Sequence, residues 1–380
     1  MNMHWLYSSL YYSFAIFWDT FWALALGYAL SACVQVFVSR EAMARAFGKA
    51  GLKEVTLATV LGAASSSCSF AAAAAGKSAF KKGAALVPTL AFMFASTNLV
   101  FELGAVIWVL LGPRFVLAEV VGAIVLIALM WSIVSWTLSS RLEEEARRHV
   151  ETAEGESCHE SESEGGEKRG FFQRLALRET WGNIADAFYM DVSMMWKELL
   201  MGFLIAGFAM VLIPGEWWQA LFLKNGPEPL RVVENAVVGP VIAALTFLCS
   251  CANIPLAALL WDHGISFGGV ISFIYADLII VPLLLTYRKY YGAKAATYIS
   301  VVLFASMVGA GLVVDLLFHG LGLVPEVSHG ASGGGMHEMS FGGYNAWLNG
   351  VALLVLVALG WLRRSQRKEH TKTKSSCCCH

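Results

Sequence analysis

Charged residues are scarce in this sequence. Asp, Glu, Lys and Arg together make up only 14% of its 380 residues, against about 25% in soluble domains. Hydrophobic residues account for 57%, so a soluble fold could not cover its surface with polar side chains, and disorder is excluded for the bulk of the chain. An excess of basic residues is absent too, because 27 Lys and Arg stand against 28 Asp and Glu. With a net charge of −1, the sequence lacks the excess of positive charge that would favour binding to nucleic acid.

The alternation of polar and apolar residues that marks a transmembrane β-barrel is also missing. Instead, continuous apolar runs of about 20 residues recur, which is the length of a membrane-spanning helix. The N-terminal residues before the first run include no Lys or Arg, so we expect this run to stay rather than be cleaved as a signal peptide. The sequence therefore predicts an all-α, polytopic helical membrane protein. The expected full spans are Ser13–Val38, Ala84–Leu111, Phe115–Leu138, Met194–Ile213, Gly268–Thr286, Ala295–Leu317 and Asn345–Leu362.

Two further apolar segments, Val55–Gly76 and Ala236–Trp261, differ from ordinary spans. Both are rich in small residues and carry a cluster of Ser and Cys, and the second also contains Pro240 and Pro255. Irregular backbone at membrane depth is tolerated where it lines a cavity inside the protein. We therefore expect a re-entrant or broken-helix hairpin in each segment.

Basic residues set the expected topology. The segments on either side of the first hairpin, 40–53 and 77–82, are rich in Lys and Arg, so both should face the cytoplasm, which favours a re-entrant hairpin over a full crossing. The same rule places segment 319–344 outside. We expect a multi-pass protein of the inner (plasma) membrane with its N-terminus outside and its C-terminus in the cytoplasm.

The chain also repeats internally. Residues 83–96 align with residues 264–277, and a Ser/Cys cluster precedes each copy. Two inverted repeats with broken helices that meet in mid-membrane are typical of secondary transporters. The predicted parts are membrane repeat 1 (13–138), an acidic flexible cytoplasmic linker (139–185), membrane repeat 2 (186–318), a Gly- and His-rich external loop (319–344), a C-terminal span (345–362) and a cytoplasmic Cys/His tail (363–380).

The Ser/Cys clusters are the first candidate site. Thiolates select soft ions and metalloids, and polar clusters at matching positions of two repeats favour a central substrate site. Close helix packing through Ser and Ala is the alternative interpretation. Two Asn side chains could satisfy broken helix ends. The candidate substrate-binding residues are Ser66, Ser67, Cys68, Ser69, Asn98, Cys249, Ser250, Cys251 and Asn253.

Carboxylates within the apolar runs are the second candidate site. Asp277 lies in mid-span, at the position that Ser96 takes in the first repeat, and Glu102 lies deep in another span. A carboxylate at this depth is costly, so proton or ion coupling is the first hypothesis, and a hydrogen bond that fixes packing is the second. Three carboxylates near the ends of spans are weaker candidates: Asp19, Glu119 and Asp315.

The C-terminal tail ends in Cys377, Cys378, Cys379 and His380, which could capture a soft metal in the cytoplasm. Adjacent cysteines do not suit a tetrahedral zinc site, so a labile metal-binding tail is the interpretation. The sequence contains neither a Gly-x-x-x-x-Gly-Lys-Ser/Thr phosphate loop nor a His-Glu-x-x-His motif. We therefore expect no enzyme, no ATP-driven pump within this chain and no cofactor.

Several stretches resemble the ArsP-type permease family: Ser65–Gly76, Phe92–Glu102, Cys249–Pro255 and Gly264–Pro282. The most specific pieces are Ser-Ser-Cys-Ser-Phe-Ala, Phe-Ala-Ser-Thr-Asn and Gly-Ile-Ser-Phe-Gly-Gly, and the resemblance extends over residues 18–318. It implies an inner-membrane permease. Characterised relatives export trivalent organoarsenicals, and others are linked to copper or zinc efflux. By this resemblance Cys68, Cys249 and Cys251 match the family's intramembrane Ser/Cys motif.

Three functions fit these residues. The leading one is a permease that exports a thiophilic metalloid, an organoarsenical or a soft metal ion by alternating access. The second is a permease for a polar metabolite, with serines as the selective groups. The third is an intramembrane thiol redox protein that uses Cys249 and Cys251, although their spacing strains a disulfide. The expected partners are the lipid bilayer and a small-molecule or ion substrate, without nucleic acid, and a homo-oligomer stays open.

Overall fold

The computed structural model describes residues 4–37, 51–81, 83–152, 178–213, 217, 221–222, 227–246, 248, 250–325 and 344–377. Regular structure within these ranges is helical throughout, as the sequence predicts. The elements are α1 (His4–Phe37), α3 (Leu52–Ser65), α4 (Ser69–Lys81), α5 (Leu86–Asn98), α6 (Phe101–Leu110), α7 (Pro113–Thr137), α8 (Ser140–Thr152), α10 (Arg178–Leu212), α12 (Glu228–Thr246), α13 (Ser250–Asp262), α14 (Phe267–Ile274), the 3-10 helix η1 (Tyr275–Ile279), α15 (Val281–Tyr291), α16 (Ala293–Gly320) and α17 (Tyr344–Cys377).

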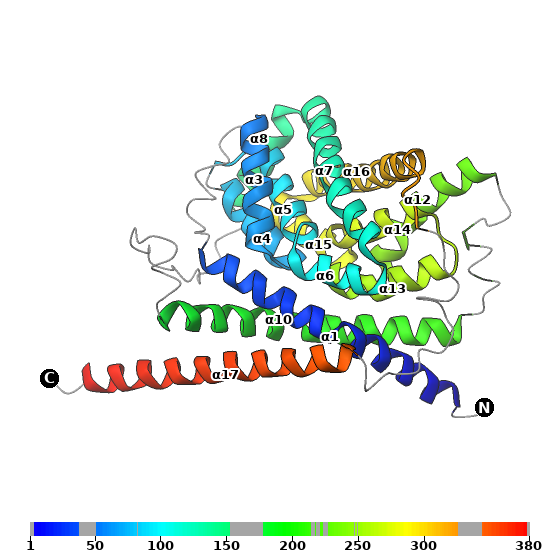
Figure 1. Cartoon of the computed structure of the whole chain (residues 1–380). Coiled ribbons are helices and arrows are strands. Elements are labelled where there is room, and N and C mark those ends of the chain that lie inside the picture. The colour runs from blue at the N-terminus through cyan, green and yellow to red at the C-terminus, as the bar shows by residue number, and fades with distance from the viewer. Residues whose placement is uncertain are drawn as a thin grey trace.

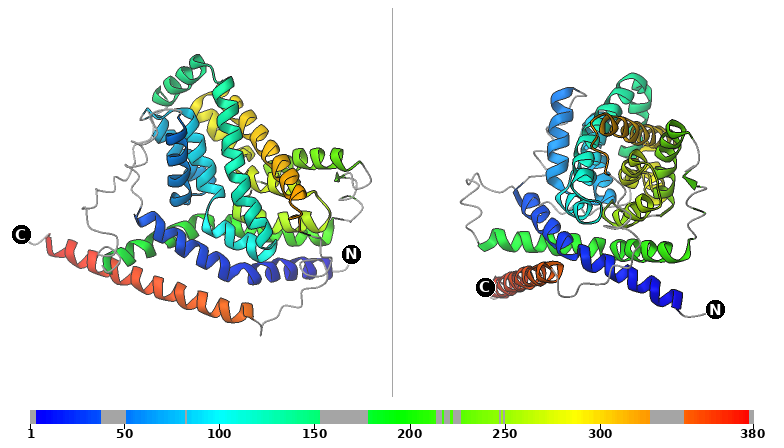
Figure 2. Two further views of the ribbon diagram at one scale, coloured as in Figure 1. Left: turned by 45° about the horizontal axis from the view of Figure 1, so that its top comes forward. Right: turned by 45° about the vertical axis from the view of Figure 1, so that its right-hand side comes forward.

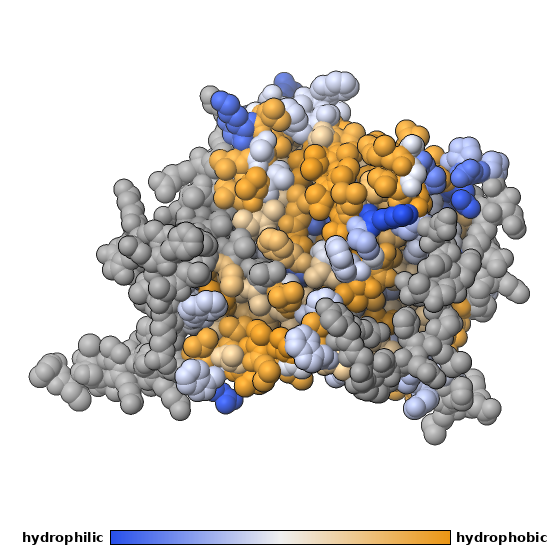
Figure 3. Space-filling model, in the orientation of Figure 1, coloured by the Kyte–Doolittle hydropathy of each residue, from blue (hydrophilic) through white to orange (hydrophobic). Residues whose placement is uncertain are grey.

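Four helical stretches are long and apolar enough to cross a membrane: α7, α12, α16 and residues Ala346–Arg364 of α17. Two bent pairs raise the number to six if each pair crosses as one unit. Helices suit a bilayer because they bond every backbone polar group within the segment. Apolar side chains cover most of the described surface on the face that Figure 3 shows, and Leu316 and Leu354 remain 76% and 71% exposed. The prediction of a multi-pass helical membrane protein is confirmed.

The predicted span Ala84–Leu111 is not one straight helix. Its two parts, α5 and α6, meet at 45°, and the break lies at Leu99 and Val100. The Asn98 side-chain amide donates to the carbonyl of Phe94 at 3.2 Å. The carbonyl of Ser96, which would accept the N–H of Val100 in a continuous helix, accepts the N–H of Ser67 instead at 2.9 Å. The polar end of α5 therefore stops the helix within the predicted span.

The predicted span Gly268–Thr286 is broken as well, with a bend of 44° between its two parts and extended backbone at Ile280. Pro282 lacks the N–H that would bond to the carbonyl of Leu278 in a continuous helix. The hydroxyl of Tyr287 donates to that carbonyl instead, at 3.2 Å. Pro282 thus ends the helix, and Tyr287 satisfies the Leu278 carbonyl, which has no helical donor.

Other predicted boundaries also change. α12 begins at Glu228, before the predicted start of the second hairpin at Ala236, and it is long enough to cross a membrane by itself. α1 and α10 are longer than the predicted spans that they contain, with 34 and 35 residues. The described residues thus give four straight candidate spans and two bent pairs, and the predicted spans Ser13–Val38 and Met194–Ile213 stay predictions within α1 and α10.

α1, α10 and α17 lie side by side as a layer along one side of the remaining bundle (Figure 1), and turned views show the same arrangement (Figure 2). Asn349 of α17 ties this layer together. Its amide oxygen accepts the N–H of Trp22 at 3.1 Å, and its amide nitrogen donates to the carbonyl of Trp18 at 2.8 Å. These two groups are four residues apart on α1, so Asn349 inserts into the hydrogen-bond ladder of that helix.

The order of elements recurs along the chain. α3 and α4 flank a break and precede the bent pair of α5 and α6. In the same way, α12 and α13 flank a break and precede a second bent pair, in which α14 and η1 are followed by α15. α3 packs on α5 as α12 packs on α14, and the helices that follow the bent pairs, α7 and α16, pack on each other. This order agrees with an internal repeat. That the two copies run in opposite directions through the membrane stays a prediction.

The predicted flexible linker begins as a helix, α8, that docks on the end of the first hairpin. The guanidinium of Arg147 donates to the carbonyls of Phe80 and Ala84, the second at 2.9 Å. The carboxylate of Glu143 accepts the first N–H of α5 at 3.3 Å. Both side chains satisfy backbone groups that helix ends leave unpaired, so the prediction of a flexible chain is wrong for α8. Residues 153–177 lie outside the described residues.

α14 and α16 cross at a pair of glycines. A Cβ on Gly311 would lie 2.6 Å from the carbonyl oxygen of Gly268, and a Cβ on Gly268 would lie 2.5 Å from the carbonyl oxygen of Gly311. Glycine lets membrane helices approach this closely. The crossing also brings Asp315 to the start of α14, where its Oδ1 accepts the N–H of Gly268 at 2.7 Å.

Gly311→Ala should destabilise the protein by about 1–3 kcal/mol, because the added methyl group must displace backbone atoms. The measurement is the apparent Tm of the purified protein in detergent. Gly320→Ala in the same helix is the matched control, since nothing lies within 4 Å of its added Cβ, and its Tm should be unchanged or higher. Equal Tm values for Gly311→Ala and the wild type would contradict the close crossing.

Candidate functional site

Two breaks between helices form the framework of the candidate site. Residues 66–68 separate α3 from α4, and Ser66 has a φ of +32°, a left-handed conformation that is unfavourable for a residue with a side chain. The N–H of Ser67 donates to the carbonyl of Ser96 at 2.9 Å, which ties this break to α5. The second break, at Leu248, lies between α12 and α13.

Asp277 joins the helices that follow the two breaks. Its Oδ2 accepts hydrogen bonds from the hydroxyl of Ser69 at 2.7 Å and from the hydroxyl of Ser250 at 2.6 Å. Ser69 is the first residue of α4, and Ser250 is the first residue of α13. Asp277 itself lies in η1, within the second bent pair. Ser69, Ser250 and Asp277 are called the polar centre below.

The polar centre is suited to hold a negative charge. The carboxylate meets two helix N-termini, whose partial positive charges favour an anion, and it accepts two hydroxyl donors. Hydrogen bonds to an ionised acceptor are roughly twice as strong as neutral ones. Asp277 is 0% exposed, and an ionised carboxylate without such partners would be very costly at this depth.

One carboxylate oxygen of Asp277 remains available. Oδ1 is buried and accepts no hydrogen bond that meets normal geometry from the residues that the structure describes. The hydroxyl of Thr97 and the N–H of Leu278 lie near the carboxylate. A buried acceptor with spare capacity can take a proton or a donor group of a ligand.

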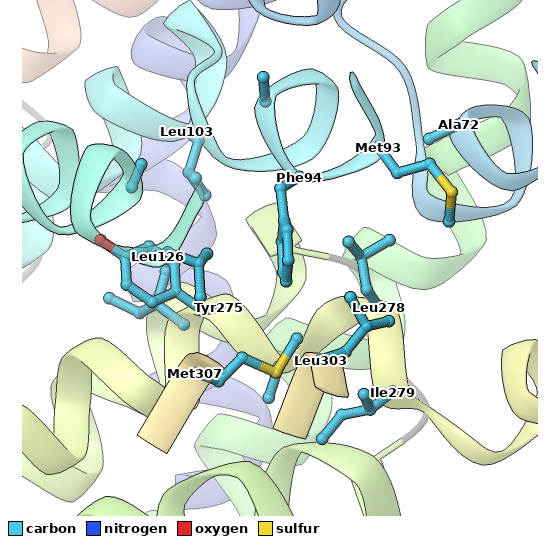
Figure 4. Packing of buried hydrophobic residues seen from close by; sticks show 14 of the residues in the cluster. Ala72, Met93, Phe94, Leu103, Leu126, Tyr275, Leu278, Ile279, Leu303 and Met307 are labelled. Carbon is cyan, nitrogen blue, oxygen red and sulfur yellow. The ribbon is translucent and has the colours of Figure 1, made fainter. Parts of the chain in front are cut away.

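Apolar side chains from both parts of the chain pack around the segment that carries Asp277. Phe94 of α5 points toward Leu303 and Met307 of α16, and Leu278 of η1 lies beside them (Figure 4). None of these four side chains is more than 1% exposed. Because such surroundings screen charges poorly, electrostatic interactions at the polar centre are stronger than they would be in water.

Glu102 lies at the first break. The hydroxyl of Ser66 donates to Glu102 Oε1, which links the break to α6. A Cβ on Gly27 would collide with the backbone of Glu102, so α1 packs directly against this point. Of the two predicted coupling residues, Asp277 therefore contacts both halves of the chain, whereas Glu102 fixes a contact within the first half.

The two predicted Asn residues act at the ends of broken helices. The Oδ1 of Asn253 accepts a hydrogen bond from the hydroxyl of Thr246 at 3.3 Å, across the second break. Asn98 donates to the hydroxyl of Thr97 at 3.1 Å and to the backbone of its own helix. Neither bonds to the polar centre in these contacts.

Two thiols adjoin the polar centre along the chain. Cys68 directly precedes Ser69, and Cys251 directly follows Ser250. Neither is in a disulfide; Cys251 is buried and Cys68 is half-buried. The sulfur of Cys68 accepts the N–H of Ala71 at 3.4 Å. Thiol groups are thus available beside the hydroxyls that contact the carboxylate.

The remaining predicted ligands lie beyond what the structure describes. Cys249 is outside the described residues, as are Cys378, Cys379 and His380, and the side chain of Cys377 is not described either. Within the described part of the chain, no group of three or more His, Cys, Asp or Glu side chains could hold a metal ion. The metal-binding tail therefore stays a prediction.

Sequence reasoning undervalued Glu119 because it lies near the start of its span. Glu119 is only 2% exposed, and its carboxylate interacts electrostatically with Asp277. Tyr275 was not singled out, yet its hydroxyl donates to the carbonyl of Glu119 at 2.8 Å. A usable signal was present, since Glu119 is the sole acidic residue of the apolar helix α7.

Asp315 has a structural explanation. Besides the Gly268 N–H, it contacts His319, whose Nδ1 lies 3.2 Å from Asp315 Oδ2. It therefore caps α14 and holds the end of α16. The side chain of Asp19 lies outside the described residues.

The model of a family of predicted permeases, ArsP_1, matches residues 8–316. The chain belongs to this permease family. It is also 39% identical over 325 residues to the Mycobacterium tuberculosis protein named "Putative permease Rv2963", and the match covers 85% of this chain and 79% of that protein. No solved structure matches the chain. The resemblance found in the sequence motifs is confirmed, and family membership implies a transporter rather than an enzyme.

In this permease, Ser69→Ala and Ser250→Ala should each lower stability by about 1.5–3 kcal/mol, because each removes a hydrogen bond to a charged group. The apparent Tm in detergent is the readout. Ser272→Ala is the matched control, since Ser272 is equally buried but donates only within its own helix, to Gly269 at 3.0 Å.

A double-mutant cycle tests the partner directly. In an Asp277→Asn background, Ser69→Ala should lose most of its effect, because the charge that strengthened the bond is already gone. An undiminished effect in that background would mean that Ser69 stabilises the fold without Asp277.

Proposed function

We propose that this permease is a secondary transporter of the inner membrane that exports a thiophilic metalloid, an organoarsenical or a soft metal ion by alternating access. In this proposal the N-terminus lies outside and the C-terminus in the cytoplasm. One observation carries the proposal: Asp277 accepts hydrogen bonds from the first residue of a helix in each half of the chain. In transporters built from two repeats, the halves rock around a site at broken helices.

Protonation of Asp277 would change how strongly the two halves hold each other. Ser69 belongs to the first half, whereas Ser250 and Asp277 belong to the second. An ionised carboxylate binds both hydroxyls strongly, and a protonated one binds them about half as strongly. Proton binding would therefore lower the free energy needed to separate Ser69 from Asp277. Movement of the halves and proton binding are coupled through this single contact.

The thiols support a thiophilic substrate. Cys68 and Cys251 are reduced thiols next to the two serines of the polar centre, and thiolates prefer soft ions and metalloids. Cys249 would add a third sulfur at the second break. The tail, Cys377–His380, would raise the local concentration of substrate at the cytoplasmic side without forming the path itself.

Replacing Cys68, Cys249 and Cys251 together by Ser should abolish export of a thiophilic substrate. The measurement is growth of a sensitive host that expresses the permease, challenged with methylated arsenite, arsenite, antimonite, copper, zinc or cadmium. Wild-type protein should raise tolerance to at least one of them, and the triple variant should leave the host as sensitive as one that lacks the permease. The Cys33→Ser variant is the control, because Cys33 is a free cysteine away from both breaks.

A permease for a polar metabolite is the second candidate. It is favoured by the fact that hydroxyls, rather than thiols, donate the hydrogen bonds to Asp277. No tolerance conferred by the wild type against any of the six agents would favour this candidate over a thiophilic one. Full tolerance in the triple Cys variant would mean that the three cysteines are not the groups that bind the exported agent.

Asp277→Asn should stop transport that a pH gradient drives, because the amide cannot release and rebind a proton. Substrate exchange at equal pH should survive, since exchange does not require the proton to cycle. Uptake into inverted vesicles, with and without an imposed pH gradient, separates the two. Glu102→Gln is the control, and it should retain gradient-driven uptake. Full gradient-driven uptake by Asp277→Asn would remove Asp277 from the coupling step.

A further inference from the structure

The carboxylate of Glu119 lies buried without a bonding partner. Glu119 is 2% exposed, and neither of its carboxylate oxygens accepts a hydrogen bond from the residues that the structure describes. An ionised carboxylate in an apolar interior is very unfavourable unless it is paired, and in practice such a group takes up a proton. The surroundings of Glu119 therefore favour its neutral, protonated form.

Tyr275 connects Glu119 to the polar centre, but its hydroxyl donates to the backbone of Glu119 and not to the Glu119 carboxylate. The tyrosine hydroxyl donates to the backbone carbonyl of Glu119 at 2.8 Å. Its ring reaches α7, where it lies beside Leu126 (Figure 4). A Cβ on Gly122 would collide with the tyrosine hydroxyl, so the glycine leaves room for this contact. Tyr275 stands two residues before Asp277 in η1, and the two carboxylates interact electrostatically.

The helices packed on α7 bring no free cation to Glu119. The main ones are α5, α6, α14 and α16. η1 and α13 also touch α7, through Tyr275 and Trp261, and they contain Asp277 and Asp262 but no Lys, Arg or His. α5 and α14 contain no ionisable side chain, and α6 contributes only Glu102, which Ser66 contacts. α16 contributes Lys294, which pairs with Glu145, together with Tyr298, Asp315 and His319, of which the last two contact each other. On α7 itself, Arg114 donates to the carbonyl of Val324 at 3.3 Å.

We propose that Glu119 is a second proton-binding residue of the polar centre and shares a proton with Asp277. When two carboxylates interact in an interior that screens charge poorly, ionising both of them is unfavourable. If one carboxylate releases its proton, the other therefore keeps its own. Asp277 can then release its proton toward one side of the membrane while Glu119 keeps the pair from carrying two negative charges. This inference rests on the proposed function for its role in transport, but the shared proton can be tested without a substrate.

The test is chemical labelling of the purified full-length permease with dicyclohexylcarbodiimide, an apolar reagent for buried carboxyl groups. The protonated carboxyl gives its proton to a carbodiimide nitrogen, and the carboxyl oxygen adds to the central carbon of the reagent. The adduct rearranges to a stable N-acylurea that peptide mass spectrometry locates. We expect an adduct on Glu119 in the wild type at neutral pH and none at that position in Glu119→Gln.

Removing the charge of Asp277 should change the titration of Glu119. In Asp277→Asn, the pH of half-maximal labelling at Glu119 should fall by about one unit or more, a tenfold loss of proton affinity, because the neighbouring negative charge is gone. Asp277→Ser, which copies Ser96 of the first half, is the second variant in case the amide disturbs folding. Asp315→Asn is the control and should leave the labelling profile of Glu119 unchanged.

Two results would overturn the inference: no adduct on Glu119 at any pH, or the same half-labelling pH in the wild type and both Asp277 variants. Neither depends on transport, so they are distinct from failure of the proposed function, which gradient-driven uptake by Asp277→Asn would reveal. Glu119→Gln adds a readout in vesicles. It should reduce gradient-driven uptake while exchange at equal pH persists, and unchanged gradient-driven uptake would show that Glu119 binds a proton with no part in coupling.

Discussion

A single carboxylate holds together two helices whose first residues lie almost half the chain apart. Asp277 accepts hydrogen bonds from Ser69 and Ser250, each at the start of a helix that follows a break. Broken helices inside a membrane are stable only if their free ends find partners, because lipid offers none. The negative charge of Asp277 supplies a partner to two of these ends at once. The arrangement of both halves around the polar centre depends on this contact.

Small residues make that contact reachable. Lipid is as apolar as a leucine side chain, so membrane helices associate through close packing and hydrogen bonds rather than through the hydrophobic effect. Gly268 and Gly311 let α14 and α16 touch backbone to backbone, and Gly122 makes room for the hydroxyl of Tyr275. These glycines position the unwound turn that carries Asp277. Larger side chains there would collide with the neighbouring backbone or with the tyrosine hydroxyl.

The same geometry accounts for the proposed chemistry. A charge that bonds both halves resists their separation, and its neutralisation by a proton loosens them. The thiols of Cys68 and Cys251, beside the two serines, would add affinity for soft ions at the place where the halves meet. Glu119 belongs to the same group of interacting side chains, because it is buried and its carboxylate interacts electrostatically with that of Asp277. Substrate, proton and conformational change would all act on one small group of side chains.

The sequence by itself determined the class of protein, since sparse charge and long apolar runs leave only a helical membrane fold, and local motifs sufficed to identify the family. It also marked Asp277 and both Ser/Cys breaks, because a carboxylate or a polar cluster within an apolar run is visible locally. The tertiary structure decided which helix ends lie next to each other. The Ser69–Asp277 bond joins residues 208 positions apart, and the break at Ile280 depends on Tyr287 replacing a missing helical donor. Glu119 looked peripheral in the sequence because its burial comes from neighbouring helices, whose packing no local pattern encodes.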